Sequence, residues 1–236
     1  MKHTRQEQIE LMASKFRAEA GLTENEPLHV KTLLLHLGVL TAYRSMSDSS
    51  YGFSMKTTDN RYRFILVNRN SRRGRQHFTI AHELYHLYFD PNPQPHICRA
   101  DSGREATEIT ANAFASVLLM PRQGLLKEIP GEEIAERHIS MATILRLEQL
   151  FGVSHEAMVN RLKHLELITD RQREQLLNVS ILNEARAYGF DLSLYQPGNE
   201  NLMIGDFGQK AKALYDAERI SEGHYHELLN LIYHEQ

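Results

Sequence analysis

Apolar residues recur at helical spacing near the start of the chain and again through its second half. In the first stretch they follow the i, i+3, i+4, i+7 pattern of one helical face. These positions are Ile9, Met12, Ala13, Phe16 and Ala20. The same spacing predicts helices over residues 141–151 and 155–165, with Gly152 between them and Ser154 placed to cap the second. Two more helices are expected between residues 206 and 233.

Between these regions the pattern changes to short apolar runs that are typical of strands. A short helix over residues 30–37 leads through Gly38 into an expected strand at residues 39–43. Residues 51–68 predict two strands joined by a turn around residues 58–60, which together form a hairpin. We expect residues 62–68 to be an edge strand, with which an extended substrate could pair.

Two helices are expected on either side of a proline-rich segment. An apolar helix is predicted over residues 78–89, after which Pro91, Pro93 and Pro95 impose an extended loop. A further helix should run from about residue 103 to residue 120, because Pro121 disfavours helical geometry just before it. Strands therefore occur only in the first half, which predicts an α+β core over residues 1–130. Residues 131–236 are expected to form a helical C-terminal region, with a boundary near Pro130 and Gly131.

Composition restricts the classes of protein to which the chain can belong. A chain of 236 residues with 42% hydrophobic residues can bury a sizeable core. The net charge of −3 argues against affinity that comes mainly from phosphate contacts, although a local basic patch remains compatible with it. The single cysteine, Cys98, excludes an internal disulfide and fits a reducing compartment. We find neither a secretory signal nor an apolar run long enough for a membrane span, and we expect a cytoplasmic protein without a membrane partner.

The segment His82-Glu83-Leu84-Tyr85-His86 matches the pattern H-E-x-x-H. Four residues correspond to about 400° of helical rotation, so both imidazoles project from one face and can reach one metal ion. Zinc suits such a site because it accepts imidazole and carboxylate ligands and activates water. Glu83 would then accept the proton of that water as general base. The alternative is a structural helix on which the pattern occurs by chance, but burial of two histidines in an apolar helix favours a metal.

A two-histidine site needs a third protein ligand, and the following helix offers Glu105 and Glu108. Glu108 is the preferred ligand, because it shares a helical face with Ala111 and Ala115, whose small side chains permit close helix packing. Glu105 is expected to be a solvated residue in the first turn. Asn112 follows Glu108 at i+4 and could form a hydrogen bond with Glu108 or with His82, or make an ordinary packing contact.

Weaker candidates lie on both sides of the motif. His96 and Cys98 follow the prolines and could contact the metal or block the site, but exposed loop positions are the commoner outcome. Arg72, Arg73 and Arg75 precede the motif and could contact a charged partner, although a solvated face is the simpler interpretation.

The segments FTIAHELYHLYF and EITANAFASVLLMP resemble the ImmA/IrrE family of metallopeptidases, and the resemblance extends over residues 27–121. It implies a zincin-like core, a Zn²⁺ site formed by His82, His86 and Glu108, and a catalytic Glu83. Tyr85 is a departure, since many relatives have glycine before the second histidine. This departure removes no ligand, but it is expected to change the packing over the metal.

Residues 147–168 resemble the helical segment that follows the core in this family, and the region around residues 141–168 also resembles a helix-turn-helix. Asn160, Arg161 and Lys163 are available for base contacts on its second helix. A helical hairpin that packs on the core or binds a protein is the favoured alternative. The C-terminal stretch resembles the tail of shorter family members, which act on DNA-binding repressors. The resemblance thus implies limited, zinc-dependent cleavage of a cytoplasmic helix-turn-helix transcription regulator; the competing function is a DNA-binding or scaffold protein with a structural metal.

Overall fold

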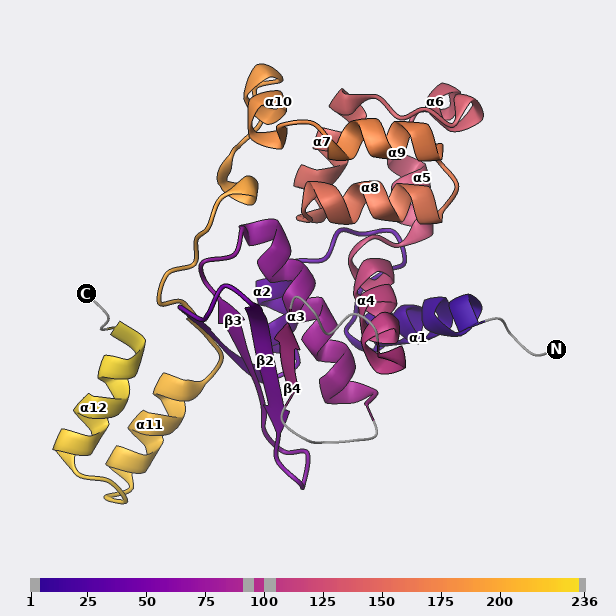
Figure 1. The fold of residues 1–236 in the computed structure, drawn as a ribbon. Coiled ribbons are helices and arrows are strands. Elements are labelled where there is room, and N and C mark those ends of the chain that lie inside the picture. Colours follow the sequence, from indigo (N-terminus) through magenta and orange to yellow (C-terminus); the bar gives the residue numbers. More distant parts are fainter. Residues whose placement is uncertain (1–4, 91–95, 100–104, 234–236) are drawn as a thin grey trace.

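A computed structural model describes residues 5–90, 96–99 and 105–233 of the chain (Figure 1). Its fold is α+β, as the sequence predicts, with one small mixed sheet and many helices. The helices of the first half are α1 (Arg5–Glu19), α2 (Val30–His36), α3 (Arg73–Tyr88) and α4 (Ala106–Leu119). The strands are β1 (Val39–Arg44), β2 (Ser50–Lys56), β3 (Arg63–Asn68), β4 (His96–Arg99) and β5 (Met203–Ile204). Helix α3 packs between the sheet and α4, and α1 packs on α4.

The sheet has the strand order β4-β2-β3-β1-β5. Strands β2 and β3 form the expected antiparallel hairpin, in which Gly52 is opposite Val67. Strand β3 also pairs in parallel with β1, so it lies at the centre of the sheet. The prediction of an edge strand at residues 62–68 is therefore wrong, because a parallel β1 covers the side that the hairpin leaves open. The edges are β4 and β5, two short strands that the sequence did not predict.

Helix α3 begins at Arg73, five residues before the predicted start at residue 78. The early turn is polar, yet Gln76 is fully buried within it. Its amide nitrogen donates hydrogen bonds to the carbonyl oxygens of Arg69, Ser71 and Gly198, and Asn199 donates to its amide oxygen. Long-range hydrogen bonds therefore permit a helical turn without the apolar pattern on which the prediction relied. The proline-rich loop at residues 91–95 lies outside the described residues.

The second half contains the expected helices and one return to the sheet. Its helices are α5 (Arg122–Glu128), α6 (Gly131–Glu136), α7 (Met141–Phe151), α8 (His155–His164), α9 (Asp170–Leu177), α10 (Ile181–Ala187), α11 (Phe207–Asp216) and α12 (Glu222–Tyr233), with a 3₁₀ turn at Ser193–Tyr195. The expectation that strands occur only in the first half is wrong, because β5 pairs antiparallel with β1. Figure 1 shows α11 and α12 side by side at the sheet, apart from the group α5–α9.

The turn between α7 and α8 has the predicted form. Gly152 adopts a left-handed conformation with φ 64°, and the Ser154 hydroxyl accepts a hydrogen bond from the Ala157 amide. Leu147 and Val159, one from each helix, belong to the same hydrophobic cluster as Leu84 of α3. The core is thus continuous across residue 130, and the division into two regions stays a prediction.

A buried polar network joins α7, α8 and the 3₁₀ turn. His155 Nδ1 lies 2.6 Å from Glu148 Oε1, and its Nε2 lies 2.9 Å from the Leu176 carbonyl oxygen. The Tyr195 hydroxyl donates to the other Glu148 oxygen at 2.8 Å. Desolvation lowers the pKa of His155, but the hydrogen bond and charge of Glu148 outweigh it, and the net pKa is raised. Two acceptors around one imidazole favour the doubly protonated cation.

Among the described residues, no helix is long and apolar enough to cross a membrane.

Candidate metal centre and its groove

Helices α3 and α4 bring the three nominated metal ligands together. His82 and His86 project from one face of α3, and Glu108 lies in the first turn of α4. The two Nε2 atoms are 3.2 Å apart. The Glu108 carboxylate oxygens lie 3.5 Å from His82 Nε2 and 3.2 Å from His86 Nε2. All three side chains are buried, and Ala111 and Ala115 on the same face of α4 are fully buried as well.

The outer nitrogen of each imidazole is held by an oxygen atom. Asn112 Oδ1 lies 3.0 Å from His82 Nδ1, so the expected contact of Asn112 is made with His82. Asp90 Oδ2 lies 3.0 Å from His86 Nδ1. A carboxylate accepts a hydrogen bond at neutral pH, so the proton of His86 belongs on Nδ1. Both Nε2 lone pairs then face the space beside Glu108, the orientation that metal-binding histidines require.

The residues present fit a zinc ion. Zinc–nitrogen bonds of about 2.0–2.1 Å in a tetrahedral arrangement separate neighbouring ligand atoms by about 3.3 Å. The observed separations of 3.2, 3.2 and 3.5 Å agree with that value. Two imidazole nitrogens and a carboxylate leave one tetrahedral position for water or substrate, as in catalytic rather than structural zinc sites.

Glu83 lies beside these ligands and is held by the sheet. It is fully buried on α3, and the Ser54 hydroxyl on β2 donates a hydrogen bond of 2.5 Å to its Oε2. Close packing of α3 on β2 makes this contact possible. A Cβ atom at Gly52 would lie 2.5 Å from the Thr79 methyl carbon and 3.4 Å from Glu83 Oε1, so only glycine leaves room there.

Cys98 belongs to the site and is not an exposed loop residue, contrary to the expectation from sequence. It lies on edge strand β4, is buried, and its sulfur falls within 4.8 Å of ligand atoms of His82 and Glu83. Burial, followed by the charges of Glu83 and Glu108, raises the pKa of the thiol far above its usual value. A neutral thiol therefore forms one wall of the site. His96 starts the same strand, and its side chain lies outside what the structure describes.

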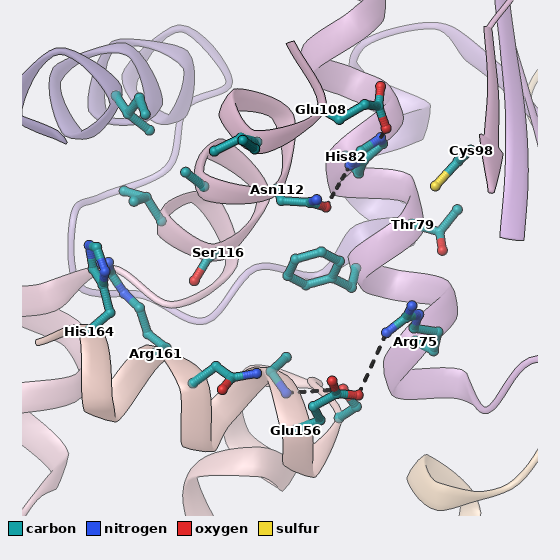
Figure 2. A pocket seen from close by; sticks show the side chains of 18 of the residues that line it. Arg75, Thr79, His82, Cys98, Glu108, Asn112, Ser116, Glu156, Arg161 and His164 are labelled. Atoms are coloured by element: carbon teal, nitrogen blue, oxygen red, sulfur yellow. Dashed lines mark hydrogen bonds and ion pairs between the residues drawn. The ribbon is translucent and has the colours of Figure 1, made fainter. Parts of the chain in front are cut away.

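A cavity of about 640 Å³ opens beside His82 and Glu108 and extends to helix α8 (Figure 2). One face of α4 forms its floor, while α1 and α3 form its sides. Arg75 lines it, stacks over the Tyr51 ring at 4.1 Å, and pairs with Glu156 of α8 at 3.8 Å. The two other arginines of the basic run do not line it: Arg72 is exposed, and the Arg73 guanidinium lies beside Gly198.

The three residues that were considered for DNA reading have partners within the protein. Arg161 is 2% exposed, and its Nε donates to the Met120 carbonyl oxygen at the end of α4. Asn160 accepts a hydrogen bond from Arg173 at 3.0 Å, and Lys163 pairs with Asp170 at 2.8 Å. These contacts fit a helical hairpin that packs on the core, the interpretation favoured from sequence.

Two functional contacts were not predicted from the sequence. Asp90 carries a usable signal, because it follows His86 at i+4, just beyond the end of α3. Ser54 carries none, since its position opposite Glu83 depends on the packing of a distant strand on α3. Glu105 lies exposed just before α4, as expected.

Residues 35–163, more than half of the chain, match the model of a peptidase family that is described as the IrrE N-terminal-like domain. The matched region contains the strands β1 to β4, both helices of the candidate metal centre and all but the last residue of α8. A search of curated proteins found no match.

Proposed function

Because the chain belongs to the peptidase family of the IrrE N-terminal-like domain, we propose that it is a zinc-dependent endopeptidase. Its proposed substrate is a cytoplasmic transcription regulator, which it cleaves at few bonds. The observation that carries the proposal is the convergence of three buried ligand atoms beside a carboxylate held for proton transfer. Family membership supports a metallopeptidase, and the choice of a regulator as substrate rests on the resemblance to shorter family members.

In the proposed reaction, His82, His86 and Glu108 hold the ion. A zinc ion at this position would polarise the scissile carbonyl group and make a water molecule more acidic. Glu83 accepts a proton from the attacking water on its carboxylate, and then donates that proton to the departing amine nitrogen. Ser54 fixes the orientation of that carboxylate through its hydrogen bond to Oε2. Asn112 keeps the His82 ring in place through its hydrogen bond to Nδ1.

We assign substrate binding to strand β4 and not to residues 62–68, the edge strand that was expected from the sequence. Strand β4 is the edge of the sheet, and it carries Cys98 beside His82 and Glu83. An extended substrate segment could add to this edge through backbone hydrogen bonds, which would present a peptide carbonyl to the site.

The nitrogen and carboxylate donors favour zinc among the metals available to such a site, while manganese and iron also accept this ligand set. Metal analysis of the protein purified without added metal tests the assignment. We expect about one zinc ion per chain, by the stoichiometry of a single three-ligand site.

The decisive experiment uses Glu83→Gln, which keeps the size of the side chain and removes the proton acceptor. Candidate regulators should yield discrete fragments with the wild type and none with the variant, while both proteins retain zinc. Undiminished cleavage by Glu83→Gln would refute the general-base role.

Gel-shift assays at two salt concentrations test the alternative function. A tight, sequence-selective shift without any cleavage would favour a DNA-binding protein with a structural metal.

A further inference from the structure

The cavity beside the metal centre continues well beyond the reacting groups. Its floor follows one face of α4 from Glu108 to Val117. Nine residues of helix advance by about 13 Å, which is the length of about four residues of extended peptide. The far end is formed by α8, whose Asn160, Arg161 and His164 line it (Figure 2). The cavity is therefore long enough to hold several substrate residues on one side of the scissile bond.

The floor is partly apolar, since Asn112 and Ser116 of α4 also line the cavity. Ala113 and Val117 of α4 line the cavity together with Phe78 of α3. Ile109 also lines the cavity and is 47% exposed, so its side chain is available to a bound segment. Such a surface gains free energy by burying apolar side chains of a bound segment.

The charges around the cavity are of opposite sign to the charge of the whole chain. Apart from Tyr51 and the residues at the metal centre (His82, Cys98 and Glu108), the charged or titratable residues that line it are Arg5, Arg75, Arg161 and His164 against a single acid, Glu156. The chain as a whole carries a net charge of −3. A second acid, Glu10, lies 3.9 Å from Arg161. Basic residues thus concentrate at this cavity, and a low-dielectric wall strengthens their field there.

We infer that this cavity binds an acidic segment of the protein substrate, with an apolar side chain on the α4 floor and a carboxylate near Arg75. The inference rests on the proposed function, and it adds a substrate class to it. Glu156 is the internal competitor, because its carboxylate pairs with Arg75 in the free protein. A substrate carboxylate would take the place of Glu156 beside that guanidinium. The apolar side chains on the floor, Ala113, Val117 and Phe78, favour this occupant over a nucleic acid strand, which would need a continuous basic track and exposed stacking surfaces.

Peptide binding to the zinc-loaded, full-length Glu83→Gln protein tests the inference without cleavage. The probes are fluorescent octapeptides that share an apolar centre and differ only in flanking Asp and Glu, Asn and Gln, or Lys. The acidic peptide should bind most tightly, and its affinity should fall as salt rises. Added to that background, Glu156→Gln should tighten binding of the acidic peptide about two- to five-fold, and Arg75→Gln should weaken it by a similar factor. Glu174→Gln, an exposed substitution on α9, serves as the matched control and should change nothing.

The two substitutions have opposite expected signs, so general damage to the fold cannot imitate the result. Equal affinity for the acidic and amide peptides, or no tightening by Glu156→Gln, would overturn the inference. Displacement of the peptide by an oligothymidylate of eight nucleotides would replace it with a nucleic acid site. If the acidic peptide binds as expected but the wild type cleaves no substrate, the cavity assignment stands and the proposed function fails.

Discussion

Removal of the Ser54 hydroxyl should slow catalysis while leaving the metal in place. Ser54→Ala deletes the 2.5 Å hydrogen bond to Glu83 Oε2, a contact between two buried groups. A hydrogen bond to a charged group contributes about 1.5–3 kcal/mol. If that contribution serves to hold the carboxylate in its reactive orientation, kcat should fall by about 10- to 150-fold, since each 1.36 kcal/mol corresponds to tenfold in rate. KM should change little, because Ser54 does not line the substrate cavity.

The assay compares kcat and KM on any peptide or regulator that the wild type cleaves, together with zinc content and thermal stability. Ser54→Thr keeps the hydroxyl and should restore most of the rate. Ser14→Ala is the matched control, because Ser14 of α1 donates a hydrogen bond of 2.8 Å to the carboxylate of Glu24 and does not line the cavity. A wild-type kcat in a zinc-loaded Ser54→Ala protein would refute the positioning role. Loss of zinc in that variant would do so as well, since it would place the defect in the metal centre.

Three further predictions concern the metal, the helical part and the helix–sheet contact. Glu108→Ala should lose most of the bound zinc and Glu105→Ala should retain it, as elemental analysis of both variants will reveal. The raised pKa of His155 means that its cation stabilises the fold fully below about pH 6.5 and loses that contribution as pH rises through the folded pKa; the difference in melting temperature between wild type and His155→Gln should therefore shrink at high pH. Gly52→Ala should destabilise the protein by about 1–3 kcal/mol in urea unfolding, because its new methyl meets the Thr79 methyl, and Thr79→Ser should recover much of that loss.

Features that depend on local spacing could be predicted from the sequence. The interval between His82 and His86 fixes their common face as soon as the segment is helical. The turn at Gly152 and Ser154 likewise follows from the conformational preferences of two residues. Glu108 could be predicted as the third ligand because Ala111 and Ala115 on its helix indicated which face packs against the neighbouring helix. The structure brings the side chains of His82, His86 and Glu108 together, while their roles as ligands stay predictions.

Features that depend on pairing between distant segments could not be predicted. Strand β5 has two residues, too few for any periodicity, and its position comes from backbone pairing with β1. Cys98 appeared to be a loop residue because nothing in its own segment reveals that β2 pairs beside it. Arg161 looked available to DNA since charged residues are usually exposed. Its burial follows from the end of α4, where the Met120 carbonyl oxygen needs a donor that the helix itself cannot supply.

The hydrogen bonds of Gln76 predict the order in which parts of the protein fold during synthesis. Every residue of the metal centre precedes residue 113, but the first turn of α3 receives its contacts from Gly198 and Asn199 only after helices α5 to α10 have been synthesised. Until then the Gln76 amide lacks these two hydrogen bonds, and β1 lacks its pairing with β5. A nascent chain on the ribosome would thus contain every nominated ligand before the first turn of helix α3 has all of its hydrogen bonds. Maturation of the site should therefore wait until residues 198–204 have left the ribosome.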